Sequence, residues 1–281
     1  MKKLTGKIAI VTGASRGIGK GIALGLAEQG ATVYIAGRTE RDDNLPGFLK
    51  GATIHHTANE VNRLGGIGIP CFCDFRVDED VKQLFARVER EQGRLDILAN
   101  SAWAGADHVM KRYFWNTPFW EQPISLFDDF YTVGLRSSYL ASMHAAKLMA
   151  HQKSGLIVNI SFYSARRYWI TPAHGVFKSA TDKMTADTAH ELKEYGIKVF
   201  SLYPGNVRTE GMVELAKQNS LLNEQDMESP QFIGRCVAAL AFDDDAIQQT
   251  GTVMITGELA QHYGFTDIDG KQPVSLRPEM W

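Results

Sequence analysis

The chain has 281 residues, of which 44% are hydrophobic and 22% charged, a composition typical of one folded chain around a single core. Lysine and arginine (30) nearly balance aspartate and glutamate (32), so the net charge of −2 provides no positive field for nucleic acid. Fibrous and disordered classes are excluded, and no window approaches the roughly 18 consecutive apolar residues of a membrane span.

Short β-branched runs alternate with amphipathic segments along the chain. The runs predict seven strands, at 7–12, 32–36, 67–72, 95–99, 155–161, 197–203 and 252–256. The segments between them predict helices, at 17–29, 78–92, 125–150, 173–194 and 230–241. Strands that are apolar almost throughout and alternate with helices indicate an α/β fold, a doubly wound parallel seven-stranded sheet covered on both faces.

Three segments lack this alternation of predicted strands and helices. They are polar or aromatic and rich in turn residues, and they span 39–51, 103–123 and 212–229. Excursions of this length usually serve as lids and binding loops. Because no linker or repeat interrupts the pattern, we expect one domain over residues 1–281.

The cysteines Cys71, Cys73 and Cys236 cannot form a paired framework, and Cys71 and Cys73 alternate along a predicted strand. We therefore expect buried structural thiols. The apolar run 8–11 is shorter than the roughly 7–15 residues of a secretory h-region, so we expect a cytoplasmic protein.

The first strand runs into a glycine-rich turn, Gly13-Ala14-Ser15-Arg16-Gly17-Ile18-Gly19, and a helix follows at once. Gly13 permits the tight turn, Gly17 lets the backbone approach a pyrophosphate, and Gly19 lets the helix lie close to the sheet. A glycine pattern in this position predicts a dinucleotide site.

The residue just past the second strand normally meets the adenosine ribose, where an acid repels a 2′-phosphate. Here that residue is Arg38, and Arg16 lies on the glycine loop. Two guanidinium groups are suited to a phosphate, which favours NADP(H) over NAD(H). Asp74 follows the third strand and Asn100 ends the fourth, at the same edge of the sheet.

These motifs, with Lys178 and the segment Tyr203-Pro204-Gly205 that leads to Thr209, resemble the short-chain dehydrogenase/reductases over nearly the whole chain, and most closely their dehydrogenase/reductase member 1 branch. The resemblance implies a Rossmann-type domain, a nicotinamide cofactor and a homodimer or homotetramer built on two long central helices. It implies that residues 15–19 bind the pyrophosphate, that Asp74 binds adenine, and that Asn100 and Lys178 hold the nicotinamide-side ribose. It also implies that Thr209 lies in the segment that receives the carboxamide.

The resemblance implies an active site with a relay of Asn, Ser, Tyr and Lys. This chain departs from that relay at three of the four positions. The Tyr position, four residues before Lys178, is His174. The Ser position is Phe162, with Ser161 adjacent, and the Asn position is Thr132. The candidate catalytic residues are therefore His174, Lys178, Thr132 and Ser161.

A histidine has an ordinary pKa of about 6.5 and is a usable acid or base at neutral pH. A cationic Lys178 nearby would favour neutral imidazole, which is a base. Phe162 donates no hydrogen bond to a developing oxyanion. The sequence thus favours a site that takes a proton over one that gives it.

Aromatic residues are concentrated on segments expected to border the cleft. We expect a substrate pocket from Trp103, Phe162, Tyr163, Tyr168 and Trp169, with His108 within reach. Such walls suit a flat, apolar, aromatic or cyclic small molecule. The remaining histidines show no metal-like spacing, so we expect no metal.

Three functions remain open. The first is an NADP(H)-dependent oxidoreductase that acts on a ring-bearing carbonyl or alcohol through His174 and Lys178. The second is a cofactor-independent oxygenase, isomerase or lyase in which His174 deprotonates an aromatic ketone or lactam. The third is a non-catalytic NADP(H)-binding module. We expect no nucleic-acid or membrane partner for any of them.

Overall fold

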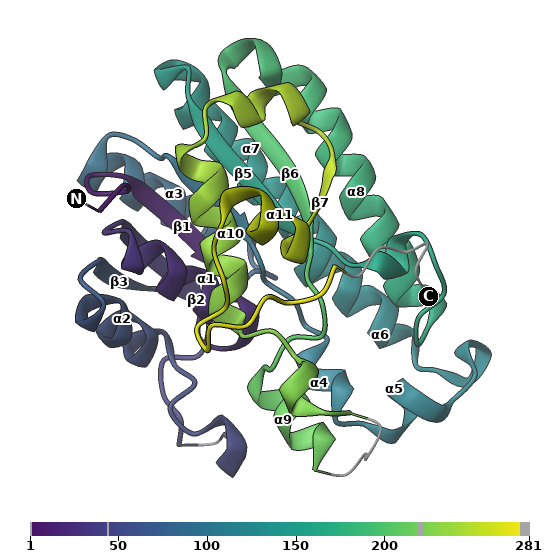
Figure 1. The fold of residues 1–281 in the computed structure, drawn as a ribbon. Coiled ribbons are helices and arrows are strands. Elements are labelled where there is room, and N and C mark those ends of the chain that lie inside the picture. Colours follow the sequence, from purple (N-terminus) through teal and green to yellow (C-terminus); the bar gives the residue numbers. More distant parts are fainter. Residues whose placement is uncertain (1, 44, 218–221, 276–281) are drawn as a thin grey trace.

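The computed structural model describes residues 2–43, 45–217 and 222–275. Its centre is a parallel seven-stranded sheet in the order β3-β2-β1-β4-β5-β6-β7 (Figure 1). This confirms the predicted fold class, and β3 and β6 match their predicted bounds. The strands are β1 (Ile8–Thr12), β2 (Thr32–Gly37), β3 (Ile67–Phe72), β4 (Ile97–Asn100), β5 (Gly155–Ile160), β6 (Ile197–Tyr203) and β7 (Val253–Ile255).

Helices cover both faces of the sheet (Figure 1). One face carries α1 (Gly17–Glu28), α2 (Ile54–Arg63), α10 (Pro230–Phe242) and α11 (Thr256–Tyr263). The other carries α3 (Asp78–Gln92), α7 (Ser137–Gln152) and α8 (Pro172–Leu192). Successive side chains of β1 point to opposite faces of the sheet. Ala9 and Val11 pack in the hydrophobic core on one face, and Ile8 and Ile10 in the core on the other.

The short elements gather beyond the carboxyl ends of the strands (Figure 1). They are α4 (Ala106–Val109), α5 (Arg112–Asn116), α6 (Ile124–Asp129) and α9 (Glu210–Ala216), with short 3₁₀ turns such as Gly47–Leu49, Phe119–Glu121 and Tyr163–Ala165. All three segments expected to be loops therefore lie at the edge where open α/β sheets bind ligands. Residues 44 and 218–221 of these segments lie outside the described part of the chain.

The sequence pattern missed α2, α4, α5, α9 and α11. Helix α2 buries Ile54, Thr57, Ala58 and Val61, which have the i, i+3, i+4, i+7 spacing of an amphipathic helix, but only Ile54 and Val61 of these are large and apolar. Its start is nevertheless well defined, because the hydroxyl of Thr53 accepts a hydrogen bond of 3.1 Å from the backbone N–H of His56.

The long helix predicted at 125–150 is interrupted. Helix α6 continues into a π-helical segment, Phe130–Arg136, and only then into α7. Such segments often occur at functional sites. Val133 and Gly134 of this segment line the cavity described below.

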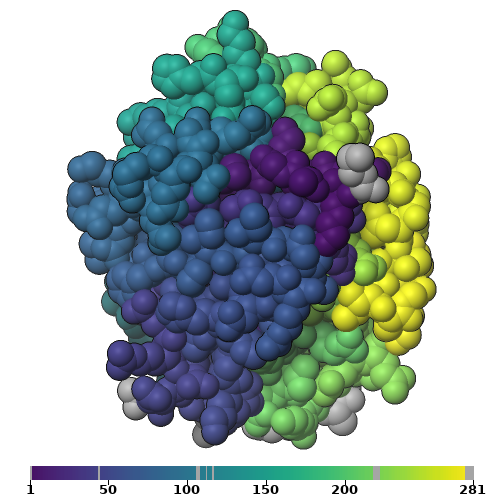
Figure 2. Space-filling model, turned by 90° about the vertical axis from the view of Figure 1, so that its left-hand side faces the viewer, coloured from purple at the N-terminus to yellow at the C-terminus, as the bar shows by residue number. Residues whose placement is uncertain are grey.

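Strand β3 forms one edge of the sheet. Figure 2 shows the side of the molecule built from residues near 50–95 (blue), with the C-terminal segment (yellow) along one margin. Ile67 and Phe72 of β3 are more than half exposed, at 59% and 54%.

The three cysteines are buried and unpaired, as predicted. Burial raises the pKa of the Cys71 thiol to about 11 and that of Cys73 to about 12. These thiols stay protonated at neutral pH and act as small apolar side chains.

Candidate active site

The glycine loop between β1 and α1 has the geometry that the sequence predicted. Gly13 has φ +66°, and a Cβ there would lie 2.8 Å from the Cα of Ala102. A Cβ on Gly19 would lie 2.4 Å from the carbonyl oxygen of Gly13. Any side chain at either position would push the loop off the sheet or the helix off the loop.

An acidic side chain occupies the start of α1. The backbone N–H of Gly17 donates a hydrogen bond of 3.0 Å to Oε2 of Glu210, which lies in the first turn of α9. The side chain of Arg16, at the cap position of α1, makes no capping hydrogen bond. Because a helix N-terminus attracts negative charge, the carboxylate stands where a phosphate group would bind.

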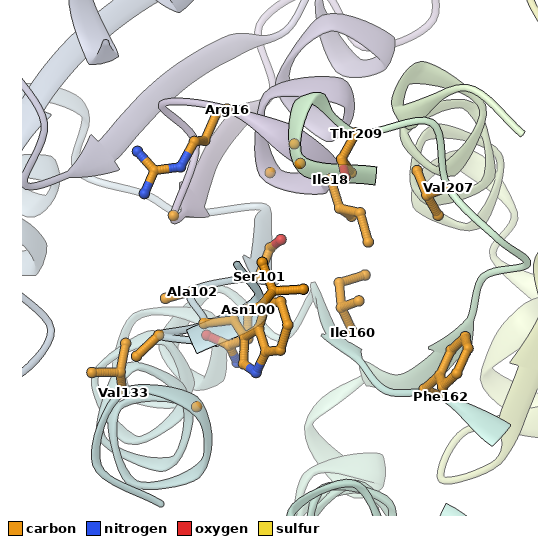
Figure 3. Close-up of a pocket in the computed structure, with 18 of the residues that line it drawn as sticks. Arg16, Ile18, Asn100, Ser101, Ala102, Val133, Ile160, Phe162, Val207 and Thr209 are labelled. Carbon is orange, nitrogen blue, oxygen red and sulfur yellow. The ribbon is translucent and has the colours of Figure 1, made fainter. Parts of the chain in front are cut away.

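A cavity of about 330 Å³ extends from this loop along the carboxyl ends of β1, β4 and β5. Figure 3 shows Arg16, Ile18 and Thr209 on one side of it, with Asn100, Ser101, Ala102 and Val133 across from them. The cavity brings together every residue predicted to bind the cofactor, namely Gly13, Ser15, Arg16, Gly17, Ile18, Gly19, Arg38, Asp74, Asn100, Lys178 and Thr209.

Asn100 is buried at the middle of the cavity. Its Nδ2 donates to Oδ1 of Asn159 at 2.8 Å and to Oγ of Ser142 at 3.0 Å. Its Oδ1 is buried and has no hydrogen-bond partner among the described residues. A free buried acceptor is costly unless a ligand donates to it, so this atom fits a hydroxyl group such as that of a ribose.

His174 and Lys178 lie one turn apart on the same face of α8, and both line the cavity. Burial lowers the pKa of Lys178 to about 7, and its Nζ donates to the carbonyl oxygen of Ile160 at 2.8 Å. Burial, and then the charge of Lys178, lower the pKa of His174 well below its ordinary 6.5. At neutral pH His174 is therefore an uncharged imidazole.

Aromatic rings surround His174. Its ring centroid lies 5.0 Å from that of Trp169, 5.8 Å from Phe130 and 6.2 Å from Trp103. Trp103, Phe162 and Trp169, three of the five residues expected in a substrate pocket, line the cavity. This end of the cavity is apolar, and Lys178 is its one charged side chain among the described residues next to His174.

The structure adds Ser164, which sequence reasoning missed. Its hydroxyl lies 2.8 Å from Nδ1 of His174, and the two side chains are buried. Ser164 is ten residues before His174, in the 3₁₀ turn that follows β5. No signal of spacing in the sequence distinguishes it from Ser161.

The other expected catalytic and pocket residues are placed differently. Ser161 lines the cavity, but its hydroxyl donates to the backbone carbonyl of Lys178 at 3.3 Å. Thr132, Tyr163 and Tyr168 are outside the lining defined by the described residues. Tyr168 is 74% exposed and donates to the carbonyl oxygen of Ile170.

The segment 103–123 closes one side of the cavity, and His108 anchors it. His108 is buried, with Nε2 2.7 Å from Oδ2 of Asp129 and Nδ1 2.6 Å from the Tyr113 hydroxyl. It does not line the cavity. Its place in the structure is thus to hold this segment on α6, whereas the sequence suggested contact with substrate.

The described residues contain no group of three or more His, Cys, Asp or Glu side chains that would hold a metal ion. No helix in the same ranges has the length and hydropathy needed to cross a membrane.

Comparison with known proteins gives consistent matches. A family model described as short chain dehydrogenase matches residues 7–220. "Dehydrogenase/reductase SDR family member 1" of Mus musculus is 42% identical over 279 residues, which cover 95% of this chain and 85% of that protein.

Among solved structures, a putative dehydrogenase from Xanthomonas campestris has a TM-score of 0.80 at 26% identity, covering 99% of this chain and 96% of that one. A 7α-hydroxysteroid dehydrogenase solved with NADH and 7-oxo glycochenodeoxycholic acid has a TM-score of 0.71 at 23% identity, covering 97% of both chains. The second likeness concerns the fold alone.

Proposed function

Because the chain belongs to the short-chain dehydrogenase/reductase family and is an oxidoreductase of that family, we propose that it interconverts a ring-bearing carbonyl compound and its alcohol with NADP(H). One observation carries the proposal: His174 and Lys178, both buried on α8, line the same cavity as the glycine loop. The two halves of such a reaction, cofactor and proton chemistry, then meet in one site.

The glycine loop and Asn100 fit a nicotinamide dinucleotide. Gly13 and Gly19 leave room that a Cβ would fill, and Glu210 already places a negative group on the N–H of Gly17. The unpartnered Oδ1 of Asn100 fits a ribose hydroxyl. When bound, the reduced nicotinamide supplies a hydride to the carbonyl carbon of the substrate.

The preference for NADP(H) over NAD(H) rests on Arg16 and Arg38. Both line the cavity, and Arg38 follows β2, at the position where an acid would repel a 2′-phosphate. Guanidinium groups bind phosphate through paired, charge-assisted hydrogen bonds.

We assign the proton chemistry to His174 and Lys178. Lys178, with a pKa near 7, holds or releases a proton at neutral pH, and its Nζ is fixed by Ile160. His174 meets the reacting oxygen of the substrate. Trp103, Phe162 and Trp169 exclude water around it, which strengthens every polar interaction inside.

The walls of the cavity indicate a flat, apolar substrate of aromatic or cyclic structure. Stacked and edge-on indole and phenyl rings bind such molecules through their faces. With Lys178 as the one charged side chain described near His174, we propose an uncharged substrate at this end.

One observation favours a second candidate function. A buried neutral imidazole in an aromatic pocket is also suited to deprotonating an aromatic ketone or lactam without a cofactor. Turnover or oxygen uptake in the absence of nicotinamide would support this candidate and contradict the first.

The test begins with calorimetric titration of NADPH into the protein, followed by NADPH oxidation with a panel of aryl and polycyclic ketones. His174→Gln should lower kcat by about 10²-fold or more, the usual cost of a lost donor at a developing oxyanion, and leave the Kd for NADPH unchanged. His190→Gln, at an exposed position of the same helix, is the matched control and should change neither. An absence of NADPH binding would overturn the proposal.

We also propose a homodimer or homotetramer in the cytoplasm. Tyr139 and Met143 on α7 and Val176 on α8 are 53%, 44% and 55% exposed, which fits an interface across these two helices. Buried unpaired thiols fit a reducing compartment. Light scattering and cell fractionation test the two points.

A further inference from the structure

A buried serine holds the ring of His174. Ser164 Oγ lies 2.8 Å from Nδ1, and the two residues are each 4% exposed. Within the described residues, neither atom has a second hydrogen-bond partner. The two side chains therefore share one isolated hydrogen bond. Which of the two atoms carries the hydrogen decides which one is the donor.

The ring is neutral. Burial and the neighbouring Lys178 lower the pKa of His174. His174 also lies in the first turn of α8, which begins at Pro172, where the positive end of the helix disfavours imidazolium. A neutral imidazole has a single N–H, on either Nδ1 or Nε2.

The two arrangements differ in what they leave unsatisfied. If Ser164 donates to Nδ1, the hydroxyl hydrogen and the Nδ1 lone pair are both used. If Nδ1–H donates to Ser164, the hydroxyl hydrogen has no acceptor among the described residues. A buried donor without an acceptor is unfavourable, which favours the first arrangement.

The free ring nitrogen faces the cavity. His174 is part of the cavity lining and Ser164 is not, so the edge of the ring opposite Nδ1 is the edge that a substrate meets. That edge carries Nε2, for which no hydrogen bond is found within residues 2–43, 45–217 and 222–275.

We propose that Ser164 is a positioning residue that donates its hydroxyl hydrogen to Nδ1 of His174 and so keeps the single ring N–H on Nε2, directed into the cavity. The functional meaning of this arrangement rests on the proposed carbonyl chemistry. His174 then acts as a neutral hydrogen-bond donor to the carbonyl oxygen, the role that Phe162 is unable to fill. The arrangement opposes the base role that the sequence favoured, because Nε2 has no free lone pair.

The direct test is an NMR experiment on the protein without cofactor. Histidine labelled with ¹⁵N in the ring reports from its nitrogen shifts which nitrogen carries the proton, and His174→Gln identifies the signals of His174. At pH 7.5 we expect a protonated Nε2 and an unprotonated Nδ1. A proton on Nδ1, or on both nitrogens, would overturn the proposal.

Variants extend the test. Ser164→Ala should move His174 to a mixture of tautomers and lower kcat by about 10-fold to 100-fold without raising the KM for NADPH. Ser164→Thr keeps the hydroxyl and should retain the wild-type tautomer. An unchanged His174 spectrum in Ser164→Ala would contradict the proposal.

The chain offers a matched control. Ser179 lies on α8, and its hydroxyl donates to the carbonyl oxygen of Ala165 at 2.7 Å, in the same 3₁₀ turn as Ser164. Ser179→Ala removes a comparable hydrogen bond and should leave the spectrum and kcat unchanged. If the Ser164 variants do not fold, the wild-type spectrum alone decides. If NADPH fails to bind, the proposed function falls and the tautomer result stands.

Discussion

Arg38 gives the clearest prediction at the level of a single residue. Its exposed side chain lies at the mouth of the cavity, directly after β2. A hydrogen bond to a charged group contributes about 1.5–3 kcal/mol, or roughly 10-fold to 100-fold in affinity. Arg38→Ala should raise the Kd for NADPH by that factor and leave the Kd for NADH within twofold.

The control is Arg41→Ala, an exposed arginine three residues further along that does not line the cavity. Calorimetry with both cofactors measures the two variants. Equal losses for NADH and NADPH in Arg38→Ala would show that Arg38 does not recognise the 2′-phosphate.

Local spacing explains which site residues could be predicted. Gly13, Gly17 and Gly19 follow one another on a single turn, and His174 and Lys178 share one helix face, so sequence separation fixes their geometry. Ser164 and Glu210 could not be found in this way. Ser164 meets His174 only because the turn after β5 folds back onto α8, and Glu210 reaches Gly17 across 193 residues.

At the scale of elements, the contact between α9 and the start of α1 has a direct consequence for binding. The Glu210 carboxylate occupies the N–H of Gly17 that a pyrophosphate needs, so a bound cofactor must displace it. Charge at a helix N-terminus is worth about 0.3–1 kcal/mol, or roughly twofold to fivefold. Glu210→Ala should therefore lower the Kd for NADPH by that factor.

The matched control is Glu214→Ala, on the same helix, whose carboxylate pairs with Lys217 at 2.8 Å. It removes the same charge without touching the glycine loop and should leave the Kd unchanged. Weaker NADPH binding in Glu210→Ala would mean that the side chain supports the bound state.

The predictability of the helices follows the size of the apolar side chains in their buried faces. Helix α3 matched its predicted bounds because Val81, Leu84, Phe85 and Val88 form a strong stripe among charged residues. Helix α2 has the same spacing of buried positions, but two of them are Thr57 and Ala58, so its stripe holds fewer large apolar side chains. The π-helical segment Phe130–Arg136 could not be predicted either, because it changes hydrogen-bond register without changing the apolar pattern.

For the whole molecule, Glu228 connects four separate parts of the chain and makes stability depend on pH. Its carboxyl accepts hydrogen bonds from the backbone of Gly205 after β6 and from the hydroxyl of Thr256 at the start of α11. It lies beside Ser229, the cap of α10, and near Asp267 of the C-terminal segment. Burial, above all, raises the pKa of Glu228 to about 8.

The folded state holds a proton on Glu228 that the unfolded chain releases near its ordinary pKa of 4.5. The stabilisation of the folded state by this bound proton is therefore complete below pH 4.5, falls as the pH rises, and is gone above about pH 8. Between pH 6 and 8.5 we expect the unfolding free energy of wild type to fall by about 2.5 kcal/mol relative to that of Glu228→Gln. Urea unfolding at several pH values measures this difference.

Lys178 and His174 affect the free energy of unfolding in the direction opposite to Glu228. Their pKa values are lowered in the folded state, so their contribution to stability rises with pH. Both remain in Glu228→Gln, so their contributions cancel in the comparison. Glu194→Gln, at an exposed position, should parallel wild type. Parallel curves for wild type and Glu228→Gln would contradict the raised pKa.

The aromatic wall of the cavity also has an optical consequence. Three of the chain's five tryptophans, Trp103, Trp115 and Trp169, line the one cavity in which His174 lies. Indole emission overlaps the absorption of a reduced nicotinamide, and it responds to the polarity of whatever replaces water beside the ring. The intrinsic tryptophan fluorescence of the protein should therefore report whether a ligand fills the cavity. A chemical library can be screened for binding in this way before a substrate is known.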